Sequence, residues 1–253
     1  VDAPREADHE ASGAGARHLF AHPARQAFSL GHDSRHLPSC ASDRFGDIVE
    51  ALPMTQWFVD VNKKIPDRDA SLKEMIKRAI VKGYKNDPKQ KINITPERFE
   101  KVVLNWLDNL HDWCISRQIW WGHRIPVYYH KQGMTNEMRN ANANAEEIFV
   151  GAEPPDGDNW EQDPDTLDTW FSSGLWTFST LGWPKNKTPL APLLKGGGDD
   201  LKTFHPTSWM QMGYEILFFW LARMILMSTY ALDQIPFKDV YIHGMLRNEL
   251  GKK

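Results

Sequence analysis

The longest apolar run of the chain follows a glycine and an acidic residue near its C-terminal end. A short, mainly apolar stretch leads into Gly213 and Glu215, and the apolar segment 216–227 comes directly after them. Its spacing fits a buried helix better than a strand, so the pattern predicts a strand, a turn and a helix. In open α/β sheets, ligands bind at such turns, where a glycine lets backbones approach and a carboxylate can accept a ribose hydroxyl. Nucleotide binding is therefore one hypothesis, and an ordinary core helix is the other.

Two amphipathic helices are predicted upstream of this stretch. The first should start after an N-cap at Asp69 or Ser71 and should end at Gly83. Its buried stripe is expected to comprise Leu72, Met75, Ile76, Ala79 and Ile80. The second should start with Thr95 as N-cap and Pro96 in the first helical position. Its buried stripe is expected to comprise Phe99, Val102, Val103, Trp106, Leu107 and Leu110.

Composition and strand patterns divide the chain into two parts. Residues 1–45 are rich in Ala, His and Arg and contain no Lys, which predicts a poorly ordered leader. Residues 46–253 have the pattern of apolar and polar residues of a globular domain, with strands expected at 56–61 and 125–129. A polar insertion, with a hairpin, is expected at about residues 130–163.

The overall composition excludes several kinds of protein. A formal net charge of -3 gives no general polyanion-binding surface, and 41% hydrophobic residues suffice for a real core. The two cysteines, Cys40 and Cys114, support neither a disulfide framework nor a zinc site, so we expect no metal site in this chain. The most apolar segment, 216–227, is too short to span a membrane, and nothing at the start of the given sequence resembles a signal peptide. A reducing, cytoplasmic setting and no membrane partner are therefore expected.

A group of donors beside tryptophans marks the middle of the chain. Arg117, Gln118, His123 and Arg124 flank Trp120-Trp121 between a helix end and the strand expected at 125–129. Cationic groups next to aromatic rings suit an anion or a stacked base. A packed aromatic corner with hydrogen-bonded polar ends is the alternative.

Three blocks of this sequence resemble one enzyme family. The blocks are Trp113 to Pro126, Asp163 to Trp176, and Gly213 to Gly244 with Gly251-Lys252-Lys253 after it. Together they are similar to the valyl-, isoleucyl- and leucyl-tRNA synthetases, members of the class I aminoacyl-tRNA synthetases. The form Trp121-Gly122-His123-Arg124 looks like the valyl branch. The resemblance covers residues 43–253 in order.

The resemblance implies a fold and several missing parts. Residues 46–253 would form the second half of a doubly wound, Rossmann-like parallel sheet in an α/β catalytic domain, with an irregular insertion at about 130–163. The first catalytic half, the editing domain and the anticodon-binding domain would lie outside this chain. The isolated chain is therefore expected to be inactive, to need the missing first half, and to leave apolar surface exposed where that half would pack.

The resemblance also implies a reaction and a set of roles. A valine carboxylate would attack the α-phosphate of ATP, bound with Mg²⁺, and the activated valine would be transferred to tRNA(Val). ATP would be bound by Gly213, Glu215, His243, Gly244 and Met245. The amino-acid pocket would be lined by Trp170, Ile216 and Trp220. Lys253 would begin a mobile catalytic loop, and tRNA or phosphate would contact Arg117, His123 and Arg124.

The sequence leaves two alternatives to a valyl-type synthetase. An isoleucyl-type synthetase is the alternative within the family, and Trp121 and His123 argue against it. A non-catalytic paralogue that binds nucleotide or RNA is the alternative from another class.

The pocket helix is expected to place Ile216 and Trp220, four residues apart, on one face.

Overall fold

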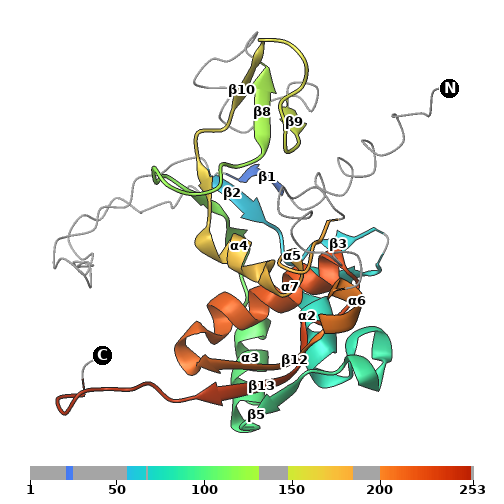
Figure 1. Cartoon of the computed structure of the whole chain (residues 1–253), viewed down its shortest axis with the longest axis vertical. Helices are drawn as coiled ribbons and strands as arrows, with labels where there is room; N and C mark the ends of the chain where they lie inside the picture. Colours follow the sequence, from blue (N-terminus) through green and yellow to red (C-terminus); the bar gives the residue numbers. More distant parts are fainter. Residues whose placement is uncertain (1–20, 25–55, 67, 131–147, 185–199, 252–253) are drawn as a thin grey trace, which may run out of the picture. The chain divides into compact units, whose positions relative to one another are not determined.

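The computed structural model describes residues 21–24, 56–66, 68–130, 148–184 and 200–251 (Figure 1). They fall into two compact units. Unit 1 comprises Cys114–Gln118, Arg124–Asp165 and the described residues up to Val59; unit 2 comprises Asp60–Trp113, Ile119–His123 and the described residues from Thr166 on. Of the expected leader, only strand β1 (Ala21–Ala24) is described, and its remainder lies outside the described residues.

Three antiparallel strand pairs lie in unit 1. Strand β2 (Gln56–Val59) pairs with β1, so the strand expected at 56–61 is confirmed but ends earlier. Strand β8 (Val127–His130) lies between β9 (Ile148–Val150) and β10 (Trp160–Gln162). The strand expected at 125–129 is thus shifted, because Ile125 and Pro126 precede the ladder.

A three-stranded parallel sheet forms the base of unit 2. Its order is β12 (Thr207–Gly213), β13 (Phe237–His243) and β5 (Asn93–Thr95), with β13 in the centre. The chain crosses from β12 to β13 through 3₁₀ turn η4 (Tyr214–Ile216), π-helical turn η5 (Leu217–Leu221) and helix α7 (Ala222–Ala231). The predicted strand, turn and helix are therefore confirmed, and unit 2 is an α/β structure.

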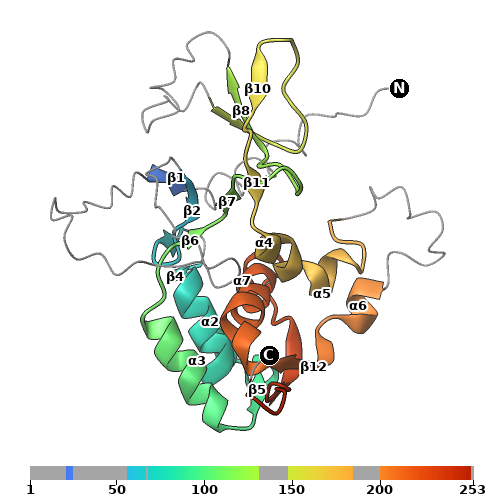
Figure 2. The same ribbon diagram turned by 90° about the vertical axis from the view of Figure 1, so that its left-hand side faces the viewer.

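The described residues also form several short elements. They are β3 (Lys64–Ile65), β4 (Ala70–Ser71), η1 (Tyr84–Asn86), η2 (Pro88–Gln90), β6 (Trp113–Cys114), β7 (Ser116–Arg117), β11 (Thr166–Leu167), α4 (Thr169–Gly174), α5 (Trp176–Ser179) and α6 (Asp200–Phe204). Helices α4 and α5 pack against α7, and so does helix α2 (Leu72–Val81) (Figure 2).

Helix α2 (Leu72–Val81) begins at a capping box. The Ser71 hydroxyl accepts from the Glu74 N–H at 3.2 Å, and the Glu74 carboxylate accepts from the Ser71 N–H at 2.8 Å. Of the two expected caps, Ser71 is therefore the one used. All five residues of the expected stripe are buried, and Gly83, with φ of 91°, follows the helix end. This helix was predicted correctly because its signals are local.

Helix α3 (Arg98–Asp108) differs from its prediction at both its cap and its stripe. Thr95 is not an N-cap, because it belongs to β5 and pairs with Tyr241. Only Val103 and Leu107 of the expected stripe are buried, and Val102 is 45% exposed. Only a narrow stripe of this helix is therefore in the core of unit 2.

The sheet of unit 2 is open on one face. Val240 and Ile242 of β13 and Met212 of β12 are buried, whereas the alternate residues Trp209 and Tyr241 are 56% and 43% exposed. Parallel sheets are normally covered on both faces. Among the described residues, Trp209 and Tyr241 thus leave aromatic surface exposed on this face, and packing of the first catalytic half there stays a prediction.

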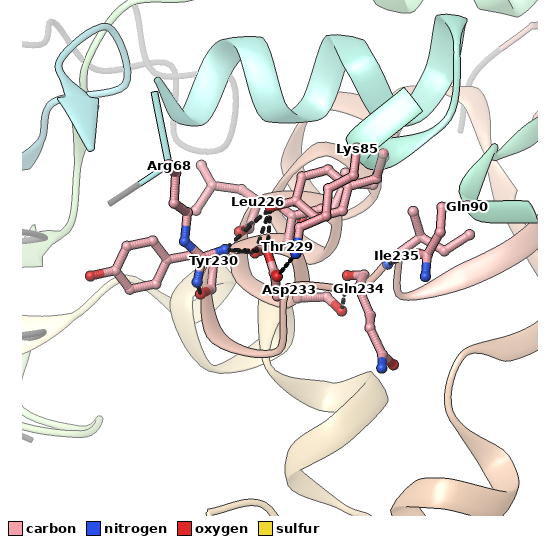
Figure 3. Close-up of polar contacts among 12 residues, drawn as sticks. Arg68, Lys85, Gln90, Leu226, Thr229, Tyr230, Asp233, Gln234 and Ile235 are labelled. Atoms are coloured by element: carbon pink, nitrogen blue, oxygen red, sulfur yellow. Dashed lines mark hydrogen bonds and ion pairs between the residues drawn. The ribbon is translucent and has the colours of Figure 1, made fainter. Parts of the chain in front are cut away.

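The C-terminal end of α7 is held by a polar network (Figure 3). The Arg68 guanidinium donates to the Thr229 and Tyr230 carbonyls at 2.6 and 2.7 Å, and to the Asp233 carboxylate at 2.9 Å. Tyr84 also donates to Asp233, at 2.7 Å. The last carbonyls of a helix lack intrahelical donors, so this guanidinium satisfies two of them from a distant part of the chain.

Replacing Arg68 with methionine should destabilise unit 2 by about 2 kcal/mol, because two helix-end carbonyls and a carboxylate lose a charged donor. The measurement is the free energy of unfolding in urea, followed by far-UV circular dichroism. Lys64→Met is the matched control: Lys64 also pairs with an aspartate, Asp69, but both side chains are at least 70% exposed. Its effect should stay within about 0.5 kcal/mol. Equal losses in the two variants would contradict this role for Arg68.

Candidate active site at the ends of the parallel strands

The candidate site lies at the carboxyl ends of β12 and β13. Gly213 ends β12, His243 ends β13, and the two residues are register partners across the parallel ladder. Ligands of open α/β sheets bind at this end of the strands. Two residues that are 30 positions apart in the sequence, and that were both expected at an ATP site, are therefore neighbours.

The Glu215 carboxylate lies against the Gly213 backbone. A Cβ atom added to Gly213 would stand 2.5 Å from the Glu215 Oε2 atom, so the glycine leaves space for this side chain. The Oε2 atom is buried and has no hydrogen-bond partner among the described residues. Buried carboxylate oxygens normally accept hydrogen bonds. This oxygen is thus available to a hydroxyl donor such as that of a ribose.

The segment after β13 offers an accessible backbone. The His243 Nδ1 atom donates to the Gly244 carbonyl at 2.7 Å, and this hydrogen bond fixes the orientation of the ring. A Cβ atom on Gly244 would meet nothing within 4 Å. Gly244 is exposed and Met245 is half-buried. A planar ligand could therefore approach this stretch closely.

Helix α4 and the turn η5 bring two of the expected pocket residues to one place. Trp170 of α4 stacks on Phe219 of η5, with ring centroids 5.6 Å apart. The Trp220 indole N–H donates to the Ser173 carbonyl of α4 at 3.1 Å. Trp170 and Trp220 are half-buried, so both keep accessible surface. Phe219 and Ser173 had not been expected at this place.

Ile216 and Trp220 do not share one face of a regular α-helix. Ile216 ends the 3₁₀ turn η4, with φ of -103° and ψ of 9°, and Trp220 lies in the π turn η5. The expectation of a common α-helical face is wrong, because residues four apart are no longer in line in a π turn. Such turns occur frequently at functional sites.

Comparisons with known proteins identify the family. Residues 44–253 match the family model of tRNA synthetases class I (I, L, M and V). The chain belongs to this family. Over 213 residues it is 44% identical to valine–tRNA ligase of Geobacillus kaustophilus (strain HTA426), 44% to that of Bacillus subtilis (strain 168) and 45% to that of Latilactobacillus sakei subsp. sakei (strain 23K).

These matches cover 84% of the chain and 20% of each relative. The chain thus spans about a fifth of the length of these ligases. Among solved structures, Mycobacterium tuberculosis methionyl-tRNA synthetase bound by methionyl-adenylate is 15% identical, with a TM-score of 0.49. That match covers 84% of this chain and 31% of the other.

The side chains expected to contact tRNA have hydrogen-bond partners within residues 44–253, the segment that matches the family model. Arg117 donates to the Ser116 carbonyl at 2.7 Å, and Arg124 donates to the Asp163 carbonyl at 2.8 Å. The His123 Nδ1 atom lies 2.9 Å from the Ser172 hydroxyl. Contact with tRNA or phosphate stays a prediction, and each of the three side chains also holds local structure.

The tryptophans of this region are not packed. Trp120 is 94% exposed and Trp121 is 85% exposed, so the alternative of a packed aromatic corner is wrong. Lys253 lies outside the described residues. Within the part of the chain that the structure describes, no cluster of three or more His, Cys, Asp or Glu side chains suits a metal, and no helix is long and apolar enough to span a membrane.

The buried side chain of His205 predicts that the stability of the folded chain depends on pH. His205 is 7% exposed, and burial lowers its pKa below the usual 6.5. Its Nδ1 atom lies 3.3 Å from the Thr177 carbonyl, and its Nε2 atom lies 3.3 Å from the Ser228 hydroxyl. The unfolded chain therefore binds a proton at a higher pH than the folded chain does.

The stability associated with neutral His205 should be complete above pH 6.5 and should fall as the pH drops below that value. We expect the melting midpoint to fall by about 2–4 °C between pH 7.5 and 5.5 from this residue. His205→Gln should lose this component, and His111→Gln, at an exposed position, should keep it. An unchanged pH profile in His205→Gln would assign the dependence to other groups.

Proposed function

We propose that this chain forms part of a valine–tRNA ligase, which activates valine with ATP and transfers it to tRNA(Val). The observation that carries the proposal is the identity of 43–45% over 213 residues to valine–tRNA ligases. The geometry supports it independently, because an unsatisfied buried carboxylate oxygen lies beside a glycine at the carboxyl end of a parallel strand.

The reaction would proceed in two steps without a covalent enzyme intermediate. In the first, a carboxylate oxygen of valine forms a bond to the α-phosphorus of Mg²⁺-bound ATP, and the bond to the leaving pyrophosphate breaks. In the second, a terminal ribose hydroxyl of tRNA attacks the valyl carbonyl carbon, its proton is lost to a base, and AMP leaves. Catalysis would come from positioning and charge stabilisation.

Each part of the site has a role in this proposal. Glu215 would accept a ribose hydroxyl of ATP beside Gly213, and residues 243–245 would lie along the adenine. Trp170, Ile216 and Trp220 would line the pocket for the valine side chain. Lys253 would begin the loop that neutralises phosphate, and Arg117, His123 and Arg124 would approach tRNA.

The chain would work as the second half of a doubly wound catalytic domain in a cytoplasmic enzyme. The open face of its parallel sheet, with Trp209 and Tyr241 exposed, supports a further layer supplied by the first catalytic half. The 253-residue chain alone should therefore not activate valine.

A chimeric enzyme tests the proposal. Residues 44–253 of this chain would replace the matching segment of the Geobacillus kaustophilus valine–tRNA ligase, and ATP–pyrophosphate exchange would be measured with valine, isoleucine or no amino acid. We expect exchange that depends on valine and exceeds that with isoleucine. Preference for isoleucine would indicate the isoleucyl-type alternative. A folded chimera that binds ATP without exchange would indicate the non-catalytic paralogue and overturn the proposal.

A further inference from the structure

Each aromatic residue of the turn η5 has its own partner. Phe218 stacks on Trp106 of α3 with ring centroids 4.6 Å apart, Phe219 stacks on Trp170 of α4, and Trp220 donates to the main chain of α4. Three consecutive side chains therefore point at two different helices. All three belong to the single π-helical turn η5, so the winding of this turn decides which helix each of them meets.

The hydrogen bonds of the turn explain how it stays wide. The Ala222 N–H donates to the Leu217 carbonyl, five residues back. An α-helix would instead use the Phe218 carbonyl, four residues back. That carbonyl accepts a hydrogen bond from the Arg223 Nη1 atom at 2.6 Å. The Arg223 side chain thus supplies a donor to the acceptor that an α-helical turn would need.

The Arg223 guanidinium is itself fixed in place. It lies over the ring of Trp113, 4.4 Å from the centroid, and 5.9 Å from the centroid of Phe219. The Trp113 indole N–H donates to the buried Asp168 carboxylate, the residue before α4, at 2.9 Å. Helix α4 also approaches the Arg223 backbone closely, since a Cβ atom on Gly174 would lie 3.3 Å from the Arg223 carbonyl oxygen.

We propose that Arg223 is a positioning residue: it keeps η5 π-helical and thereby holds Trp220 at the amino-acid pocket, which sets the size selectivity of that pocket. The inference rests on the proposed function. Relaxation of η5 to an α-helix would rotate its residues by about 100° relative to α7, the turn of one residue. Trp220 could not then remain at Ser173, and the pocket would lose a wall and admit larger side chains.

The first test examines the turn without any assay of activity. Crystal structures of the 253-residue chain would be determined for the wild type, Arg223→Met and Arg223→Lys. In Arg223→Met we expect the Ala222 N–H to move from the Leu217 carbonyl to the Phe218 carbonyl. Arg223→Lys, which keeps a charged donor but no planar group, should fold if Arg223→Met does not. A π turn that persists in both variants overturns the proposal.

The second test measures selectivity in the chimera described above. Arg223→Met should reduce the ratio of kcat/KM for valine to kcat/KM for isoleucine by about tenfold. Arg223→Lys should fall between it and the wild type, and the KM for ATP should not change. Arg98→Met is the matched control, because Arg98 also lies over an aromatic ring but is exposed on α3. A merely destabilised enzyme would lose activity toward both amino acids equally.

The outcomes separate this inference from the proposed function. An altered turn with a reduced ratio supports the role of Arg223. An altered turn with an unchanged ratio shows that η5 does not set selectivity and overturns the proposal. A wild-type chimera without valine-dependent exchange contradicts the proposed function, while the crystal structures still decide whether Arg223 holds the turn.

Discussion

Gly213→Ala should reduce the kcat/KM for ATP in valine activation by the chimeric enzyme about a hundredfold, while the fold stays intact. The backbone of Gly213, with φ of -71° and ψ of 149°, is open to any residue, so alanine introduces no strain there. The new Cβ atom would instead stand 2.5 Å from the Glu215 Oε2 atom and force the carboxylate away. The loss therefore comes from displacing the proposed ribose acceptor.

A double-mutant cycle provides the control for this prediction. Glu215→Ala removes the carboxylate and should cost about as much as Gly213→Ala. In the Glu215→Ala background, the added methyl group no longer meets a carboxylate, so the double variant should be no worse than either single variant. Thermal melting would verify that all three variants are folded. Additive losses in the double variant would show that Gly213 acts by a route other than Glu215.

The elements that the sequence predicted correctly are those with local signals. The capping box at Ser71 and the stripe of α2 lie within a dozen consecutive residues, and a period of 3.6 is sufficient to identify them. The strand, turn and helix around Gly213 are also contiguous. The proximity of Gly213 and His243 was expected only from the family resemblance, because it depends on strand order in the parallel sheet.

The errors arise where tertiary contacts decide the local structure. Thr95 has the side chain of a helix cap, but pairing with β13 draws it into a strand. The apolar run after Glu215 does not indicate a π turn. Its residues are apolar at nearly every position, so the pattern fits the period of an α-helix and that of a π-helix equally well. The only signal was a single charge: Arg223 interrupts that run, and a charged residue within an apolar helix suggests a specific partner.

The resemblance to a family also does not separate catalytic residues from structural ones within a block. Asp163 and Asp168 stand at the start of the same block as Trp170. Both are buried, at 6% and 5% exposure, and both accept from a tryptophan N–H. Their partners lie in the protein itself, which indicates that these carboxylates hold structure and do not bind substrate.

Asp163→Ala should therefore destabilise unit 1 by about 3–5 kcal/mol, the largest loss of stability that we expect from a single substitution in this chain. Its carboxylate accepts from the Trp57 indole N–H at 2.8 Å, from the Tyr129 hydroxyl at 2.8 Å and from the Asp165 N–H at 2.9 Å. Alanine would leave these three donors without their carboxylate acceptor, and the surrounding packing would limit the access of water to them.

Native-state hydrogen exchange measures this loss within unit 1 alone, even if the two units unfold separately. Amides of β8 and β10 should lose protection in Asp163→Ala, whereas those of α2 and α7 in unit 2 should change little. Asp156→Ala, at an exposed aspartate of the same unit, is the matched control and should leave β8 unaffected. Asp163→Asn should be intermediate, since its amide keeps one acceptor oxygen but places an NH₂ group among donors. Unchanged exchange of β8 in Asp163→Ala would mean that the three donors find other acceptors, and the carboxylate would not be the anchor of this unit.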